Sequence, residues 1–129
     1  MPKSERRPRK RTSPRRLPSE VTTGLAAALD KKAIDPVVLD LRKGSAFTDF
    51  FVICTGSNAR QVQAIADAIK DALGETGVRP ALVEGYQRAD WVLIDYFDVI
   101  FHVFMPATRE FYALERLWGG AEQIAVSAT

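Results

Sequence analysis

The chain has 129 residues, of which 47% are hydrophobic and 26% are charged, and its formal net charge is +2. This length fits a single domain with a core large enough to fold unaided, and the single cysteine, Cys54, excludes an internal disulfide and a cysteine-based zinc site. The sequence has no apolar run near the ~20 residues of a membrane span and no signal-peptide core, so we expect a cytoplasmic protein without a membrane partner.

The first 18 residues differ in composition from the rest of the chain. They contain eight basic residues, one acidic residue and four prolines, for a net charge of +7. We expect a disordered basic arm here, because such a segment cannot bury apolar surface. It either contacts nucleic acid through phosphates or serves as a solubilising tail, and its prolines argue against a transit helix. Residues 19–129 carry 10 basic and 15 acidic residues, so the arm precedes an acidic domain of net charge −5.

The first half of this domain predicts a helix, two strands and a second helix. Ser19 is suited to cap the first helix. Strands are predicted at 37–41 and 50–55, and the second is apolar throughout, which indicates a strand covered on both faces. Gly56 and Ser57 then open a long helix with Ser57 as its N-cap. Its apolar side chains recur at helical spacing: Val62, Ile65, Ala66, Ile69, Ala72 and Leu73.

The second half predicts three further strands and a last helix. A weaker strand is expected at 80–86, and a hairpin at 90–104 supplies two more. Pro106 begins a helix whose apolar stripe is Phe111, Leu114, Leu117 and Trp118. We expect residues 119–129 to be a frayed tail. The order of elements predicts an α/β domain with a mixed five-stranded sheet flanked by helices.

The hairpin is the most informative segment of the chain. A two-residue loop of Tyr96 and Phe97 would place Asp95 opposite Asp98 and Trp91 opposite His102. One face would then be apolar, with Val92, Ile94, Val99 and Phe101. The other face would combine Trp91 and His102 with two carboxylates that repel each other. These carboxylates are either turn caps or part of a docking surface for a basic partner.

Catalytic constellations are poorly represented in the sequence. Gly56 and Ser57 at a helix start resemble a phosphate-binding turn, but the next acids, Asp67 and Asp71, lie four apart on the side of the helix. No phosphate-loop pattern follows. His102, the only histidine, has no evident nucleophile or additional metal ligands, which favours a packed or hydrogen-bonded structural role. We expect Cys54 to be a buried, inert thiol.

Several motifs in one order carry a family resemblance. The hairpin DWVLIDYFDVIFHVF at 90–104 is preceded by VLDL, TDFFVICTG, RQV and EGY and followed by REFYALERLW at 109–118. This pattern resembles the signature of the ribosomal silencing factors, the Iojap-like or RsfS family. The resemblance covers residues 19–118, which we take as the domain.

The resemblance implies a nucleotidyltransferase-like fold without that fold's catalytic acids, hence a protein that is not an enzyme and needs no cofactor or metal. It implies a translational repressor that binds the large ribosomal subunit through ribosomal protein fourteen and sterically blocks joining of the small subunit. Organelle relatives assist subunit maturation, and self-association into a homodimer is also implied. The matching docking residues are Asp90, Trp91, Asp95, Tyr96 and Asp98, with Glu84 and Tyr86 as neighbours.

One position departs from the family pattern. Phe97 stands where the family commonly has glycine, and Phe tolerates a positive φ poorly. The turn is therefore longer or of another type, or Phe97 adds an exposed aromatic ring to the docking face. The basic arm lies outside the resemblance. Contact of the arm with ribosomal RNA, an assembly or RNA-binding role through it, and a nucleotidyltransferase-type enzyme are the alternatives.

Overall fold

The computed structural model describes residues 17–44, 46–124 and 126, so the predicted arm lies outside the described residues except for Leu17 and Pro18. Six strands form one mixed sheet in the order β4-β5-β6-β3-β2-β7, in which only β3 and β6 pair in parallel. The elements, in chain order, are α1 (Ser19–Asp30), β2 (Ile34–Asp40), β3 (Phe50–Thr55), α2 (Ala59–Glu75), β4 (Leu82–Glu84), β5 (Trp91–Asp95), β6 (Val99–Phe104), α3 (Pro106–Tyr112), α4 (Leu114–Leu117) and β7 (Glu122–Ile124). The mixed α/β class is confirmed, with six strands instead of the expected five.

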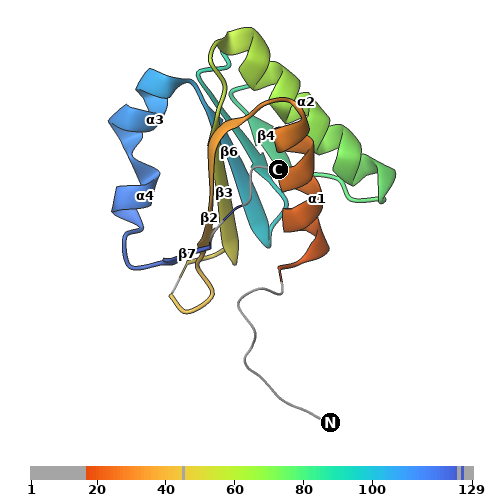
Figure 1. Ribbon diagram of the computed structural model, residues 1–129. Helices are drawn as coiled ribbons and strands as arrows, with labels where there is room; N and C mark the ends of the chain where they lie inside the picture. The colour runs from red at the N-terminus through yellow and green to blue at the C-terminus, as the bar shows by residue number, and fades with distance from the viewer. Residues whose placement is uncertain (1–16, 45, 125, 127–129) are drawn as a thin grey trace.

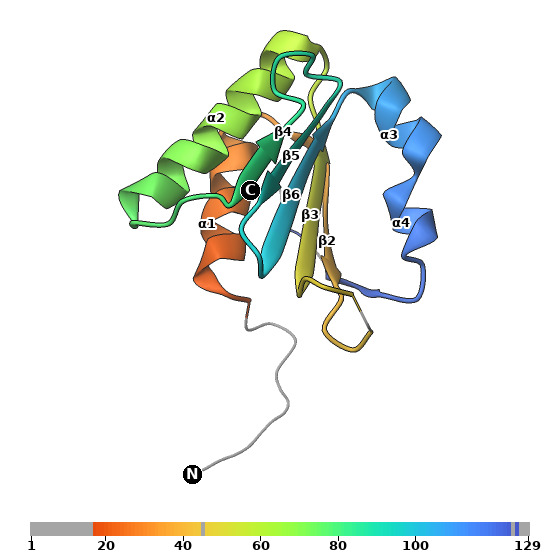
Figure 2. The same cartoon turned by 180° about the vertical axis from the view of Figure 1, so that it is seen from behind.

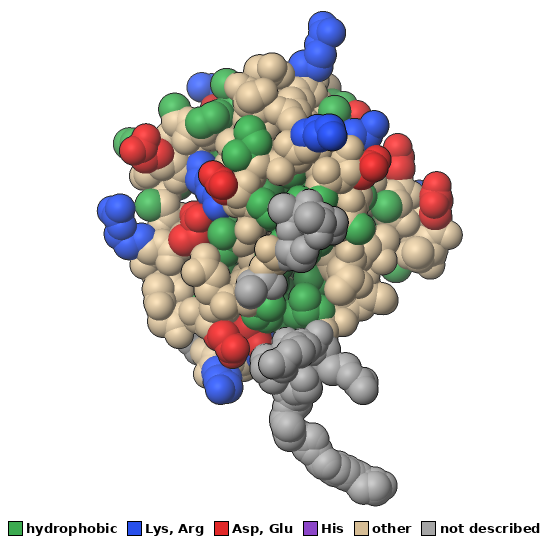
Figure 3. All heavy atoms as spheres, viewed as in Figure 1, with side chains coloured by type: hydrophobic (Ala, Val, Ile, Leu, Met, Phe, Trp, Pro, Cys, Tyr) green, Lys and Arg blue, Asp and Glu red, His purple; other side chains and the backbone are tan. Residues whose placement is uncertain are grey.

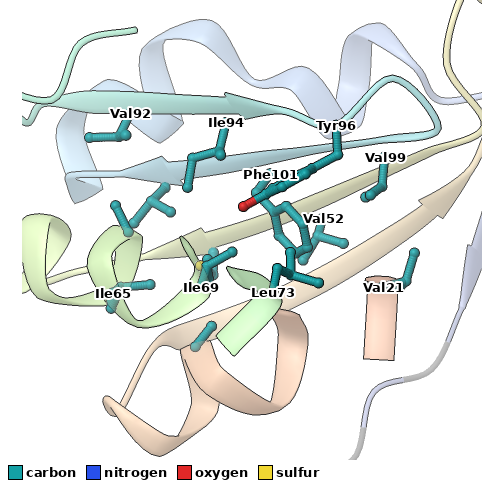
Figure 4. Close-up of a cluster of buried hydrophobic side chains, with 14 of the residues drawn as sticks. Val21, Val52, Ile65, Ile69, Leu73, Val92, Ile94, Tyr96, Val99 and Phe101 are labelled. Carbon is teal, nitrogen blue, oxygen red and sulfur yellow. The ribbon is translucent and has the colours of Figure 1, made fainter. Parts of the chain in front are cut away.

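Helices lie on both faces of the sheet. Figures 1 and 2 show α1 and α2 together on one face and α3 and α4 on the other. The larger core lies under α1 and α2, where apolar side chains of both helices pack against alternate residues of the strands (Figure 4). A smaller core lies under α4, built around Leu114, Phe51 and Phe104. No helix in the described ranges is long and apolar enough to cross a membrane.

The long helix α2 follows its predicted apolar pattern, but its N-terminus differs from the prediction. The N-cap is Asn58, whose side chain accepts a hydrogen bond from Gln61 N at 2.9 Å. Ser57 was the expected cap, and its hydroxyl instead donates to Gln61 Oε1 at 2.7 Å. A Cβ at Gly56 would lie 2.9 Å from Val62 N, so this glycine is explained by the close approach of β3 to α2. Ser19 likewise is the first residue of α1, with Pro18 at the N-cap.

The hairpin register is shifted by two residues from the prediction. Trp91 pairs with Phe104 and Asp95 with Ile100, so Asp95 does not face Asp98. The reason is the turn: Asp98 N donates to Tyr96 O at 2.9 Å around Phe97, whose φ is 72°, the geometry of a γ-turn. Because a two-residue shift leaves every side chain on its original face, the predicted division into an apolar and a mixed face still holds.

The C-terminal region departs most from the prediction. The single helix expected from Pro106 is interrupted at Ala113, whose φ is 46°. Of the predicted stripe, Leu114 is buried, whereas Phe111 and Leu117 are 80% and 73% exposed. The expected frayed tail contains β7, which pairs with the edge of β2. On the face shown in Figure 3, acidic and basic side chains are interspersed among hydrophobic ones.

Candidate docking face around Trp91

One part of the sheet is left open by the helices. The register of β4 on β5 places Leu82 opposite Asp95 and Glu84 opposite Leu93, and paired residues share a face. This face is the one opposite α1 and α2, because Val83 and Ile94 between them contribute to the larger core. All members are at least partly exposed. We call the following set the Trp91 face: Leu82, Glu84, Trp91, Leu93 and Asp95.

Trp91 is held in place from three sides. Its indole Nε1 donates a hydrogen bond to His102 Nδ1 at 3.1 Å. Its ring stacks on Phe104 at a centroid distance of 5.0 Å and contacts Tyr112 at 4.7 Å. The side chain remains half-buried. It is therefore a preorganised aromatic ring at the border between the smaller core and the open part of the sheet.

His102 supports Trp91 from inside the protein. The imidazole is 3% exposed and packs edge-on against Phe51 at 4.5 Å. Burial lowers the pKa of His102 to about 4, because a low-dielectric site disfavours the charged ring. A neutral ring that accepts at Nδ1 carries its proton on Nε2, and this atom has no hydrogen-bond partner among the described residues. The predicted hydrogen-bonded, structural role of this histidine agrees with these contacts.

Three carboxylates lie on or beside the Trp91 face. Glu84 is exposed on β4. Asp90, directly before β5, forms a 3.2 Å ion pair with the exposed Arg88. Asp95 Oδ1 accepts a hydrogen bond from Phe97 N at 2.8 Å, so this aspartate caps the turn, one of the two interpretations of its position. The rim of the face is therefore predominantly acidic.

The structure separates three predicted docking residues from this face. Tyr96 is 7% exposed and its ring points into the larger core against Phe101, at 5.8 Å (Figure 4); burial raises its pKa to about 12. Tyr86 donates its hydroxyl to Asp67 Oδ2 of α2 at 3.0 Å. Asp98 is exposed in the turn beyond the far end of β5. Tyr96 therefore cannot contact a partner at the Trp91 face.

Sequence reasoning missed a group of aromatic residues beside Trp91. Tyr112 touches Trp91, and Phe111 packs edge-on against Tyr112 at 5.0 Å. Both residues were visible in the motif at 109–118, but Phe111 was placed in a buried stripe. They extend the exposed apolar area next to the Trp91 face.

The cavity beside the turn at Gly56 and Ser57 is lined by both acidic and basic side chains. It has a volume of about 460 Å³ and is lined by Asp35, Arg109 and Glu115 among others, and Arg109 donates to Thr55 Oγ1 at 2.8 Å and to Glu115 Oε2 at 2.7 Å. Asp67 instead lies against Tyr86. Within the described part of the chain, no three His, Cys, Asp or Glu side chains are grouped as a metal site. Cys54 is buried, and burial raises its pKa to about 12.

Comparison with known proteins gives a consistent family. Residues 14–129 match the family described as ribosomal silencing factor during starvation, RsfS. The ribosomal silencing factor RsfS of Bacillus subtilis is 47% identical over 96 residues, covering 74% of this chain and 81% of that protein. A mouse protein named mitochondrial assembly of ribosomal large subunit protein 1 is 30% identical over 91 residues, covering 68% of this chain and 40% of that protein.

A solved structure supports the same assignment. The crystal structure of a Chromobacterium violaceum protein has a TM-score of 0.76 and 36% identity, covering 86% of this chain and 93% of that chain. The names of the matching relatives describe a ribosome-associated regulatory factor. The hairpin, the sheet and these matches together show that the chain belongs to the RsfS family of ribosomal silencing factors.

Proposed function

We propose that the chain binds the large ribosomal subunit through its ribosomal protein fourteen and represses translation by blocking association with the small subunit. The observation that carries this proposal is the fixed, half-buried Trp91 on an open sheet face with an acidic rim. Interfaces are dominated by a few central aromatic anchors surrounded by polar residues. The Trp91 face has this composition on a rigid scaffold.

Charge supports the choice of partner. Residues 19–129 have a net charge of −5, and ribosomal proteins bind RNA and are basic. Complementary charge steers such partners together and fixes their orientation. Glu84, Asp90 and Asp95 place part of this charge at the edge of the Trp91 face, where it would surround an aromatic contact.

The proposed repression requires no catalytic step. A protein seated on the joining face of the large subunit prevents association by occupying the space that the small subunit requires. The proposed contact set is the Trp91 face with Asp90, extended by Phe111 and Tyr112. We further propose that this takes place in the cytoplasm and that the basic arm adds contacts to ribosomal RNA phosphates. A homodimer formed through the same face would compete with the subunit.

The test compares two tryptophans. Trp91→Ala should weaken binding to purified large subunits in a pelleting assay by about 30-fold or more, the usual effect of losing an aromatic anchor. Trp118→Ala is the matched control, because Trp118 packs against Phe51 in the smaller core at 5.6 Å and lies outside the proposed contact set. Trp118→Ala should change the affinity less than threefold. Thermal melting checks that both variants are folded.

Equal affinities for Trp91→Ala and the unchanged chain would contradict the docking assignment.

Assembly of the large subunit is a second candidate function, favoured by the name of the mouse relative. The two functions differ in the cell: loss of repression leaves mature subunits that join freely, whereas loss of an assembly factor leaves immature large subunits in a sucrose gradient.

A further inference from the structure

The end of the sheet where β5 turns into β6 carries two exposed phenylalanines. Phe47 and Phe97 are 81% and 72% exposed, and their loops are joined. Thr48 Oγ1 donates to Phe97 O at 2.7 Å, and Asp49 N donates to Asp98 O at 3.0 Å. We call Phe47, Asp49, Phe97 and Asp98 the tip surface.

The stability of the fold does not explain why residue 97 is a phenylalanine. Its φ of 72° lies in the left-handed region, which glycine adopts without a penalty and Phe does not. Its ring also gains little from folding, because it remains in solvent. Two unfavourable features at one residue, next to a second exposed aromatic ring, indicate a contact that is made by the side chain.

The charge around these rings favours a cationic occupant. Asp49 and Asp98 are exposed. A third carboxylate, that of Asp95, accepts a hydrogen bond from Phe97 N. The nearby Arg42 is already engaged, because its guanidinium bonds both carboxylate oxygens of Asp40 at 2.9 and 2.7 Å. Arginine suits such a surface, since its planar guanidinium stacks on aromatic rings and pairs with carboxylates.

The chain enters the domain beside the tip surface. A Cβ at Gly24 would collide with the Phe101 ring, so the two residues are in close contact. Leu17 is seven residues before Gly24, about 10 Å along a helix, and Asp98 is three residues before Phe101, also about 10 Å along a strand. The starts of α1 and β6 lie at the same end of the molecule (Figures 1 and 2).

We propose that the arginine-rich segment of residues 1–16 binds the tip surface of its own molecule. This segment carries eight basic residues and one acidic residue. Sixteen residues can span up to ~50 Å, more than enough to reach the tip surface from Leu17. Tethering replaces a bimolecular encounter by an intramolecular one at an effective concentration of roughly millimolar, so contacts that are weak one by one suffice. Binding should weaken as salt screens the charges.

The experiment places a nitroxide spin label on Ser4→Cys in the full chain. Cys54 stays unlabelled, because it is buried. At low salt, the amide resonances of Phe47, Asp49, Phe97 and Asp98 should lose at least half of their intensity, and they should recover at about 0.5 M salt, where the Debye length falls below ~5 Å.

Variants test the surface itself. Phe47→Ser combined with Phe97→Gly should abolish the broadening. Phe111→Ser, at an equally exposed position in α3 beyond the other end of β6, should preserve it. Uniform broadening, broadening centred on the Trp91 face, or persistence in the tip variant would overturn the proposal. So would broadening that appears only when spin-labelled and isotope-labelled molecules are mixed, since the occupant would then be a second copy. None of these outcomes depends on subunit binding.

Discussion

At the scale of single residues, His102 has the most direct consequence. Its neutral Nδ1 accepts the indole N–H of Trp91, and protonation would replace this acceptor with a second donor. The pKa of His102 is lowered by burial from 6.5 to about 4. The unfolded chain therefore takes up a proton at higher pH than the folded chain does. The stability that depends on neutral His102 is fully present above pH 6.5 and is lost as the pH falls toward 4.

The expected loss between pH 6.5 and 5 is roughly 2 kcal/mol in the free energy of unfolding, from about 1.4 kcal/mol per pH unit for one proton. Urea unfolding at a series of pH values measures it. His102→Asn offers an amide acceptor that does not titrate, so its unfolding free energy should be lower at pH 7 but nearly flat across this window. An equal slope in both proteins would show that other groups dominate the pH dependence.

At the scale of elements, the sequence predicted what depends on periodicity. Strand β3 was expected at its observed residues, and the apolar spacing of α2 located its buried face. The faces of the hairpin were also predicted correctly, because alternation is unaffected by a two-residue shift. The same alternation places Tyr96 with Val92 and Ile94 in the core, so the sequence contained the reason for leaving it out of the docking set.

Two backbone conformations with positive φ were not predicted from the sequence, because the residue types at these positions disfavour them. Ala113 interrupts the last helix with a left-handed φ, and Phe97 sets the hairpin register with another. Neither residue type favours that region, so no propensity indicated it. The break at Ala113 leaves Phe111 and Tyr112 exposed next to Trp91, which is why part of the candidate site could not be derived from helical spacing.

The hairpin turn provides a test of this strain. Phe97→Gly should raise the free energy of unfolding by about 1 kcal/mol, since relief of a left-handed Phe exceeds the added flexibility of glycine in the unfolded chain. The melting temperature should rise by about 4 °C or more. Phe97→Ala removes the ring but keeps a Cβ at positive φ, so it should gain much less. Equal stabilisation by both variants would assign the effect to the exposed ring.

At the scale of the whole molecule, the acidic domain with its asymmetric charge pattern should raise the rate of association with a basic partner. Association with the large subunit should slow by about tenfold or more between 50 and 500 mM salt, because the Debye length shortens from about 14 to 4 Å. Trp91→Ala should act mainly on dissociation, as losses of packed contacts do. Stopped-flow association and dissociation experiments separate these two effects.

Two substitutions, each of which removes one negative charge, test whether the association rate depends on the charges around Trp91 or on the net charge. Glu84 lies on the Trp91 face, and Asp71 is exposed on α2, across the sheet from it. Glu84→Gln should slow association two- to threefold at 50 mM salt, whereas Asp71→Asn should leave the rate nearly unchanged, because its charge is screened from a partner approaching the other face. If both variants slowed association equally, the net charge alone would guide the encounter, and the acidic rim around Trp91 would have no special part in it.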